Sequence, residues 1–245
     1  MTTSHLLVLD FDGTVCLGDG PVLTYARLLD EAFTAADERH PPRLVEACLA
    51  RFVGDPIADE PDGVEEALAE AADSPDGYVV AERLSRARGL DDDARSAAYA
   101  GARAALADGT LETVAPEGLA DLLDGLPDGV RVVLVTNSPE HGVVQPLERL
   151  GLADRVDEIV TDARKPSGLP AVLDRLRAEA GLAEHPERLL SVGDIWLNDL
   201  EPAAAQGSPT ALVERFAAPE ARPTHRAATL PGLYPAIRAW ATSAS

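Results

Sequence analysis

Four short groups of residues carry side chains suited to chemistry. In chain order they are Asp10 and Asp12 with Gly13 and Thr14, Thr136 with Asn137, Lys165 with Pro166, and Gly193 and Asp194 with Asp199. Together they supply a nucleophile, a general acid or base, a cation, a hydroxyl and a pair of carboxylates. If the chain brings them together, they form one reactive site.

The paired carboxylates predict a metal ion. Asp10 and Asp12 stand two residues apart, and Asp194 and Asp199 five residues apart. Carboxylates held close together repel each other, and a hard divalent cation with oxygen ligands relieves that repulsion. Mg²⁺ suits such a site, because it accepts one or two carboxylates, several waters and an oxygen of a phosphate.

Each group taken alone can also be explained by a structural or surface role without any chemistry. Two acids in a turn are common in a chain this acidic, Thr136 can simply end a strand, Lys165 can be a surface lysine and Asp199 can cap a helix. The positions favour a shared site, because each group comes after one of the apolar runs. Ligands bind at the carboxyl ends of parallel strands.

The apolar runs and the segments between them predict an α/β fold. Buried strands are expected at His5–Leu9, Arg131–Val135, Glu158–Val160, Leu189–Val192 and Thr210–Val213. Helices are expected at Pro139–Leu150, with Ser138 as N-cap, at Pro166–Glu179 and at Asn198–Gln206. Alternating strands and helices favour a doubly wound parallel sheet.

The segment 16–108 has a different pattern, with apolar residues at helical spacing and no convincing strand. Helices are expected from Val22 to Ala36, from Leu44 to Phe52, and at Glu65–Asp73, Tyr78–Arg88 and Asp92–Ala107. We therefore predict a helical domain at 16–108, inserted into a core formed by residues 1–15 and 109–245.

With these motifs, the chain resembles the haloacid dehalogenase superfamily. The resemblance lies in DFDGT at 10–14, VTNS at 135–138, KP at 165–166 and GDIWLND at 193–199. It implies a Rossmann-like core and an all-helical cap domain, which matches the predicted insertion. It leaves the substrate open, because this family selects substrates largely through the cap.

The resemblance also implies a role for each residue. Asp10 would be the nucleophile that forms an aspartyl phosphate, and Asp12 the acid that protonates the leaving oxygen and then activates water. The ligands implied for Mg²⁺ are the Asp10 carboxylate, the Asp12 carbonyl and Asp194, with Asp199 positioning the metal shell. The groups expected to bind or face the phosphoryl oxygens are Gly13, Thr136, the Asn137 amide and Lys165.

Within this superfamily the residues favour a phosphatase of small-molecule phosphates. Dehalogenases of the family lack the second aspartate, so Asp12 argues against that branch. Phosphonoacetaldehyde hydrolases need a further lysine in the cap, and Lys165 is the only lysine. A sugar phosphomutase shares the same core residues and stays open, and a domain that binds a phosphorylated metabolite without catalysis is less favoured.

The composition and the N-terminal sequence indicate which binding partners and which cellular compartment to expect. The formal net charge of -21 makes nucleic acid and anionic membranes poor partners. Cys16 and Cys48 show no disulfide spacing, and the N-terminus shows no leader or membrane segment, so we expect a cytoplasmic protein. The oligomeric state is left open.

Overall fold

The computed structural model describes residues 3–36 and 41–243. The chain divides into two compact units, a core formed by residues 1–17 and 113–245 and a helical unit formed by residues 18–112. Where the chain leaves and re-enters the core, Leu17 and Val114 form an antiparallel bridge with hydrogen bonds of 2.9 and 3.0 Å. The core therefore holds both ends of the inserted segment.

The core contains one six-stranded sheet. All of its neighbouring strands pair in parallel, in the order β3-β2-β1-β4-β5-β6. The strands are β1 (His5–Leu9), β2 (Val130–Val135), β3 (Glu158–Val160), β4 (Leu189–Gly193), β5 (Thr210–Val213) and β6 (His225–Ala227). The doubly wound α/β prediction is confirmed.

The register places the carboxyl ends of the central strands at one edge. Leu9 of β1 lies opposite Leu134 of β2 and Val192 of β4. The Asp10 N–H continues this ladder by donating to the Val192 carbonyl at 2.9 Å. The chain runs to β2 on one side of β1 and reaches β4 on the other, so Asp10 lies at the point where the strand order reverses, the usual ligand position in such sheets.

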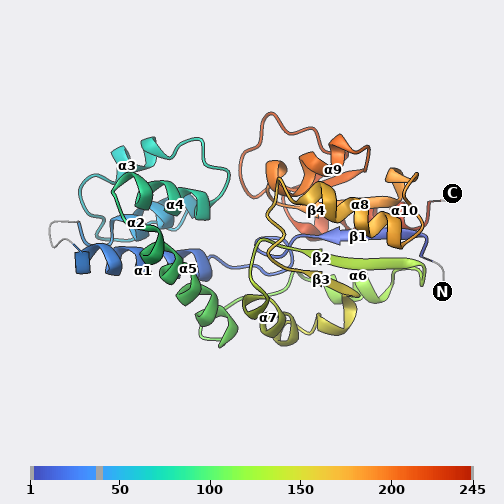
Figure 1. Cartoon of the computed structure of the whole chain (residues 1–245), viewed down its shortest axis with the longest axis horizontal. Helices are drawn as coiled ribbons and strands as arrows, with labels where there is room; N and C mark the ends of the chain where they lie inside the picture. Colours follow the sequence, from blue (N-terminus) through green and yellow to red (C-terminus); the bar gives the residue numbers. More distant parts are fainter. Residues whose placement is uncertain (1–2, 37–40, 244–245) are drawn as a thin grey trace. The chain divides into compact units, whose positions relative to one another are not determined.

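Helices cover both faces of this sheet (Figure 1). Figure 1 shows α8 (Leu169–Glu179) on one side and α6 (Leu119–Asp124) and α7 (Val144–Arg149) on the other. The first face is sealed by a fully apolar cluster of strand and helix side chains, among them Leu6, Val8, Val133, Leu169, Leu173, Leu176 and Ala203 of α9 (Glu201–Ala205). Burial of this cluster fixes the sheet that carries the strand-end residues.

The three expected core helices begin later than the sequence suggested. The segment after β2 forms a 3₁₀ turn at Glu140–Gly142 before α7, and Ser138 makes no capping bond. The helix expected from Pro166 begins at Leu169, and the one expected from Asn198 is α9, preceded by a π-helical turn at Trp196–Leu200. In the last of these segments, Asp199 lies in the π-helical turn and belongs to the site described below.

The helical unit contains five helices and, in its described residues, no strand. They are α1 (Gly20–Ala36), α2 (Leu44–Val53), α3 (Val64–Glu70), α4 (Gly77–Ala87) and α5 (Asp92–Ala107). Asp76 and Asp91 cap α4 and α5, accepting from the N–H groups of Val79 at 2.9 Å and Ala94 at 2.7 Å. The unit encloses a core of its own, with Leu29, Val45, Leu49, Val80, Leu84 and Ala102 among its buried residues.

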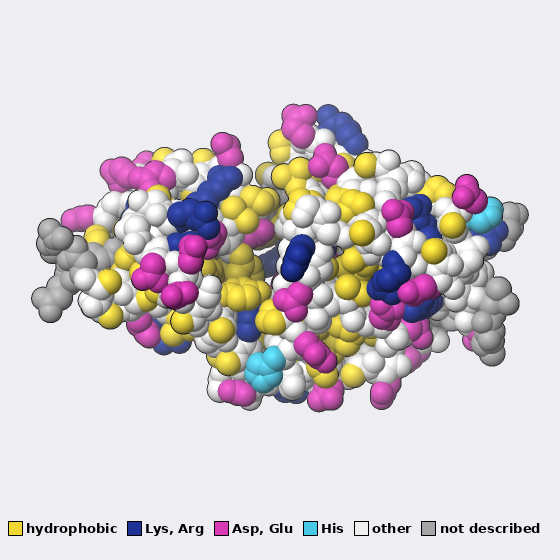
Figure 2. Space-filling view, in the orientation of Figure 1, with side chains coloured by type: hydrophobic (Ala, Val, Ile, Leu, Met, Phe, Trp, Pro, Cys, Tyr) yellow, Lys and Arg dark blue, Asp and Glu magenta, His cyan; other side chains and the backbone are white. Residues whose placement is uncertain are grey.

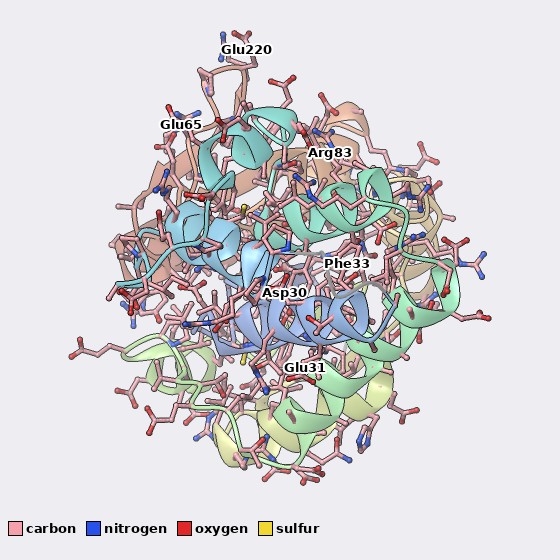
Figure 3. The ribbon with its side chains drawn as sticks, turned by 90° about the vertical axis from the view of Figure 1, so that its left-hand side faces the viewer. Asp30, Glu31, Phe33, Glu65, Arg83 and Glu220 are labelled. Atoms are coloured by element: carbon pink, nitrogen blue, oxygen red, sulfur yellow. The ribbon has the colours of Figure 1, made fainter. Side chains whose placement is uncertain are left out.

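A buried carboxylate ties two of these helices together. Asp30 of α1 accepts hydrogen bonds from the Val45 N–H at 3.0 Å and the Glu46 N–H at 2.9 Å, at the start of α2. Figure 3 labels Asp30 and the next residue, Glu31, on α1, and Glu31 is exposed and pairs with Arg27 at 3.2 Å. Asp30 thus supplies the capping carboxylate that α2 lacks in its own sequence.

No helix in the described part of the chain is long and apolar enough to cross a membrane. On the face drawn in Figure 2, acidic side chains are scattered among other residues. Many pair locally with arginine, as in Arg86–Glu82 at 2.7 Å and Arg175–Glu179 at 3.0 Å. The acids of the site differ from these, because they are buried.

Candidate active site

Three buried carboxylates meet at the carboxyl edge of the sheet. Asp10 follows β1, Asp194 follows β4, and Asp199 lies in the π-helical turn after β4. One carboxylate oxygen from each lies within 4.8 Å of the other two. Their exposed fractions are 8%, 6% and 4%. Such burial of like charges requires compensating cations.

Two glycines make room for this convergence. A Cβ on Gly13, whose φ is +83°, would lie 2.3 Å from Asp194 Oδ2. A Cβ on Gly193 would lie 2.4 Å from the Asp199 Cβ. Any side chain at either position would push a carboxylate out of place, so the glycines in DFDG and GDIW serve close approach.

Lys165 is the cation at the centre of the cluster. Its Nζ donates to Asp10 Oδ1 at 2.6 Å, to Asp199 Oδ1 at 2.7 Å and to the Val135 carbonyl at 2.9 Å. An ammonium has three N–H donors, so the protein engages all of them in this structure. A ligand oxygen that binds Lys165 must replace one of these partners.

Asn137 holds the backbone of Lys165. Its side-chain oxygen accepts from the Lys165 N–H at 2.6 Å, and its side-chain nitrogen donates to the Lys165 carbonyl at 3.0 Å. The side chain of Asn137 therefore positions the lysine, with one of its two amide N–H groups engaged by the Lys165 carbonyl. The sequence correctly predicted Asn137 at the carboxyl edge of the sheet, but it did not reveal that the Asn137 side chain binds the backbone of Lys165.

Burial and neighbouring charges together set the pKa values of Asp10 and Lys165. Burial and the nearby Asp199 charge raise the pKa of Asp10 from 3.8 to about 7, against the opposing effect of Lys165. Burial would lower the pKa of Lys165, but the carboxylates of Asp10 and Asp199 outweigh it and raise that pKa well above its usual value. Lys165 is thus a permanent cation, whereas Asp10 without a further cation is only partly ionised near neutral pH.

Asp12 stands apart from the three-carboxylate cluster. Its Oδ2 accepts a hydrogen bond from Ser138 Oγ at 2.7 Å. Ser138 is 3% exposed, and its own N–H donates to Thr136 Oγ1 at 3.0 Å. Ser138, which the sequence suggested as a helix cap, instead links the first and second groups of polar residues.

Asp199 is engaged by both of its oxygens. Oδ1 accepts from Lys165, and Oδ2 accepts from the Ile195 N–H at 3.0 Å. Ser191 Oγ donates to the Asp199 carbonyl at 2.7 Å. Trp196, in the same loop, packs against the small apolar cluster around Leu200. Asp199 therefore shapes the loop and neutralises Lys165, in addition to lying within reach of a metal ion.

Sequence reasoning missed one charged residue, Arg215. Its Nη1 lies 3.5 Å from Asp194 Oδ2, and its guanidinium lies over the Phe216 ring, 5.4 Å from the ring centroid. Arg215 comes two residues after the end of β5. The strand-end rule that identified the other groups would have found it if applied to this strand.

The structure thus gathers the sequence-derived residues at one site. Asp10, Asp194 and Asp199 form the carboxylate cluster, Lys165 lies among them, and Asn137 holds Lys165. Ser138 and Thr136 connect to Asp12. A buried carboxylate beside a cation and a second hydrogen-bonded carboxylate can attack an electrophilic centre and exchange a proton with a leaving group.

Known structures share this fold over nearly the whole chain. A protein from Haemophilus somnus described as a predicted phosphoglycolate phosphatase is 18% identical, with 97% of this chain and 99% of that chain covered and a TM-score of 0.63. A Bacillus subtilis hydrolase of the haloacid dehalogenase class, bound to magnesium, is 20% identical, with 96% and 99% covered and a TM-score of 0.59.

A dehalogenase shares the fold as well. The 2-haloacid dehalogenase of Pseudomonas syringae pathovar tomato is 17% identical, with 98% of this chain and 100% of that chain covered and a TM-score of 0.54. No match is found among curated protein sequences. At these identities the likeness shows the fold, which hosts both phosphatases and dehalogenases.

A family model also matches the chain directly. The model described as haloacid dehalogenase-like hydrolase matches residues 5–207, which include all four groups of polar residues and the inserted helices. The chain therefore belongs to the haloacid dehalogenase-like hydrolases.

Proposed function

We propose that this hydrolase is a Mg²⁺-dependent phosphatase that cleaves a small-molecule phosphate monoester through an aspartyl phosphate at Asp10. The observation that supports this most directly is the second carboxylate, Asp12, held by Ser138 at 2.7 Å beside the nucleophile's loop. A phosphate ester needs an acid for its alkoxide leaving group, whereas displacement of a halide does not.

The three-carboxylate cluster fits the proposed Mg²⁺. It offers hard oxygen ligands from Asp10 and Asp194, with Asp199 close by, and all three are within 4.8 Å of one another. The Asp12 backbone carbonyl is the third expected ligand. A bound Mg²⁺ would stabilise the ionised carboxylate of Asp10 and neutralise charge on a phosphoryl group.

With Mg²⁺ bound, the chain's own groups would supply the nucleophile and the proton transfers of a balanced two-step reaction. An Asp10 carboxylate oxygen forms a bond to phosphorus as the ester P–O bond breaks, and Asp12 gives its proton to the departing alkoxide. Asp12 then takes a proton from water as that water attacks phosphorus and the bond to Asp10 breaks. Thr136 and Lys165 would donate to the phosphoryl oxygens, for which Lys165 must release one of its present partners.

A steady-state assay tests the proposal. The purified protein is incubated with Mg²⁺ and a panel of sugar, nucleotide and short-acid phosphates, including phosphoglycolate because one structural neighbour is described as acting on it. We expect release of inorganic phosphate, loss of that activity in excess chelator, and recovery on adding Mg²⁺ back. The Asp10→Asn variant serves as the matched control for contaminating phosphatases.

Other products would identify the competing functions. An isomerised sugar phosphate without net phosphate release would indicate the phosphomutase, and halide release from a 2-haloacid would indicate a dehalogenase. Full phosphate release in chelator would contradict the proposed mechanism. Binding of a phosphorylated metabolite without turnover would indicate a non-catalytic domain that binds this metabolite.

A further inference from the structure

Arg215 is held next to the carboxylate cluster by its own segment. Its N–H donates to the carbonyl of Val213, the last residue of β5, at 2.9 Å. The preceding Glu214 donates its N–H to Ala227 at 2.8 Å and pairs with Arg226 at 2.8 Å. Because Arg226 and Ala227 belong to β6, the edge of the sheet fixes the point from which Arg215 extends.

The guanidinium reaches Asp194 across Gly13. Nη1 is 3.5 Å from Asp194 Oδ2, and a Cβ on Gly13 would lie 2.4 Å from Nη1 as well as 2.3 Å from that carboxylate oxygen. The absence of a side chain at Gly13 is therefore what lets the two charged groups approach. Arg215 keeps 27% of its side chain exposed, whereas the side chain of Asp194 is 4% exposed.

The charges of the site divide between two cations. Lys165 lies against Asp10 and Asp199, and Arg215 lies against Asp194. With Asp12, the four carboxylates exceed the two cations by two negative charges when all are ionised, which is the charge that one divalent cation cancels. A cation that binds Asp194 enters the electrostatic field of Arg215, which repels it.

We propose that Arg215 is a positioning residue of the cation site. It holds Asp194 while no divalent cation is bound, competes with Mg²⁺ for that carboxylate, and thereby weakens Mg²⁺ binding. Its partial exposure gives it room to withdraw when the cation enters. The inference rests on the Mg²⁺ site of the proposed function, but not on the identity of the substrate.

Calorimetric titration of the chelator-treated protein with Mg²⁺ alone, in low-salt buffer, tests the inference without any turnover. Arg215→Gln removes the charge and keeps a polar side chain, so we expect Mg²⁺ to bind at least about fivefold more tightly. Arg215→Lys keeps the charge and should stay closer to the wild type. Arg222→Gln is the matched control, because Arg222 is 72% exposed and pairs with Glu220 only at 3.9 Å.

Thermal unfolding supplies a second measurement. In chelator, Arg215→Gln should unfold at a lower temperature than wild type, because Asp194 loses a neighbouring positive charge, and Mg²⁺ should raise its Tm by more than it raises that of wild type. Both variants alter a partly exposed side chain, so the fold should survive.

The possible outcomes separate the two proposals. Unchanged or weaker Mg²⁺ binding in Arg215→Gln overturns the role of Arg215 and leaves the phosphatase proposal standing. Tighter binding in a protein that releases no phosphate from any substrate supports Arg215 and overturns the phosphatase. If the wild type binds no Mg²⁺, both proposals are wrong.

Discussion

Ser138 donates a hydrogen bond of 2.7 Å to Asp12 across 126 residues of sequence. It joins the segment after β2 to the loop after β1. Asp12 is the proposed acid and base, so the direction in which its carboxyl group points decides whether it can reach a leaving oxygen.

We therefore predict that Ser138→Ala lowers kcat by about tenfold or more while leaving KM and Mg²⁺ affinity nearly unchanged. The alanine removes only the hydroxyl that orients Asp12. Initial rates over a range of substrate concentrations give kcat and KM separately, and calorimetry gives the affinity. Ser138→Thr, which retains the hydroxyl, should recover part of the rate.

An equal loss in Ser138→Ala and Ser138→Thr would mean that packing around residue 138 matters and the hydroxyl does not. A rise in KM without a change in kcat would place Ser138 in substrate binding instead. Either result would remove it as the positioning residue for Asp12.

The comparison of Ser138 with Asp10 shows what sequence can reveal about this site. Asp10, Thr136, Lys165 and Asp194 were identifiable because each follows an apolar run, and parallel strands deliver their carboxyl ends to one edge. Ser138 was predicted as a helix cap because it directly precedes the helix expected at Pro139–Leu150. Its real partner is distant in sequence, and local patterns carry no information about such partners.

The missed elements have the same origin. β6 is the three-residue strand His225–Ala227, whose polar residues give no apolar run, and it is fixed by pairing with β5. Arg215 lies between these two strands, in a stretch where the sequence shows no motif. The π-helical turn at Trp196–Leu200 contains Asp199, which accepts from the Ile195 N–H four residues earlier and from Lys165, 34 residues away in sequence. The contact with Lys165 is distant in sequence, so a local pattern does not reveal it.

The raised pKa of Asp10 predicts a pH-dependent stability of the metal-free protein. The folded-state pKa of about 7 lies above the ordinary 3.8, so the folded chain binds this proton more tightly than the unfolded chain. The free energy of unfolding should therefore fall as pH rises from about 4 to about 7, by up to about 1.4 kcal/mol per pH unit, and level off above 7.

Urea unfolding in chelator between pH 5 and pH 8 measures this slope. Asp10→Asn has no proton to lose and should flatten it, while abolishing turnover because an amide does not attack phosphorus. Glu220→Gln changes a 95% exposed acid and should leave the slope unaltered. A wild-type slope that survives in Asp10→Asn would assign the titration to another group.

The bridge between Leu17 and Val114 predicts that the core folds without the inserted helices. The two backbone hydrogen bonds hold the chain ends together, and the helical unit has a separate apolar core. Replacing residues 18–112 by a short Gly-Ser linker should give a protein that unfolds cooperatively and still binds Mg²⁺.

Circular dichroism during urea unfolding and Mg²⁺ calorimetry check this prediction. If the helical unit is the cap that selects substrates, the shortened protein should also lose discrimination among the phosphates of the panel. An unfolded product, with the isolated segment 18–112 also unfolded, would show that the two units depend on each other. It would then contradict the predicted domain division.

The three acceptors around Lys165 predict that arginine cannot replace it. Nζ lies within 2.9 Å of Asp10, Asp199 and the Val135 carbonyl, and the lysine side chain is 4% exposed. A guanidinium is wider and planar, so it cannot make the same three contacts from this buried position. Lys165→Arg should lower kcat/KM by at least about a hundredfold, and near wild-type efficiency would exclude a role for the ammonium in the reaction.

The same contacts predict a strong energetic coupling between Lys165 and Asp10. Lys165→Met removes the cation and leaves two buried carboxylates side by side, so we expect it to lower the free energy of unfolding by about 3 kcal/mol at pH 8 in chelator. Asp10→Asn removes one of those carboxylates, and Lys165 keeps its contact with Asp199 at 2.7 Å.

In the double variant the methionine faces one buried charge instead of two. The double variant should therefore lose less free energy of unfolding than the two single variants lose together, by about 1 kcal/mol or more in urea unfolding. Additive losses would show that the 2.6 Å contact between Lys165 and Asp10 contributes nothing to stability.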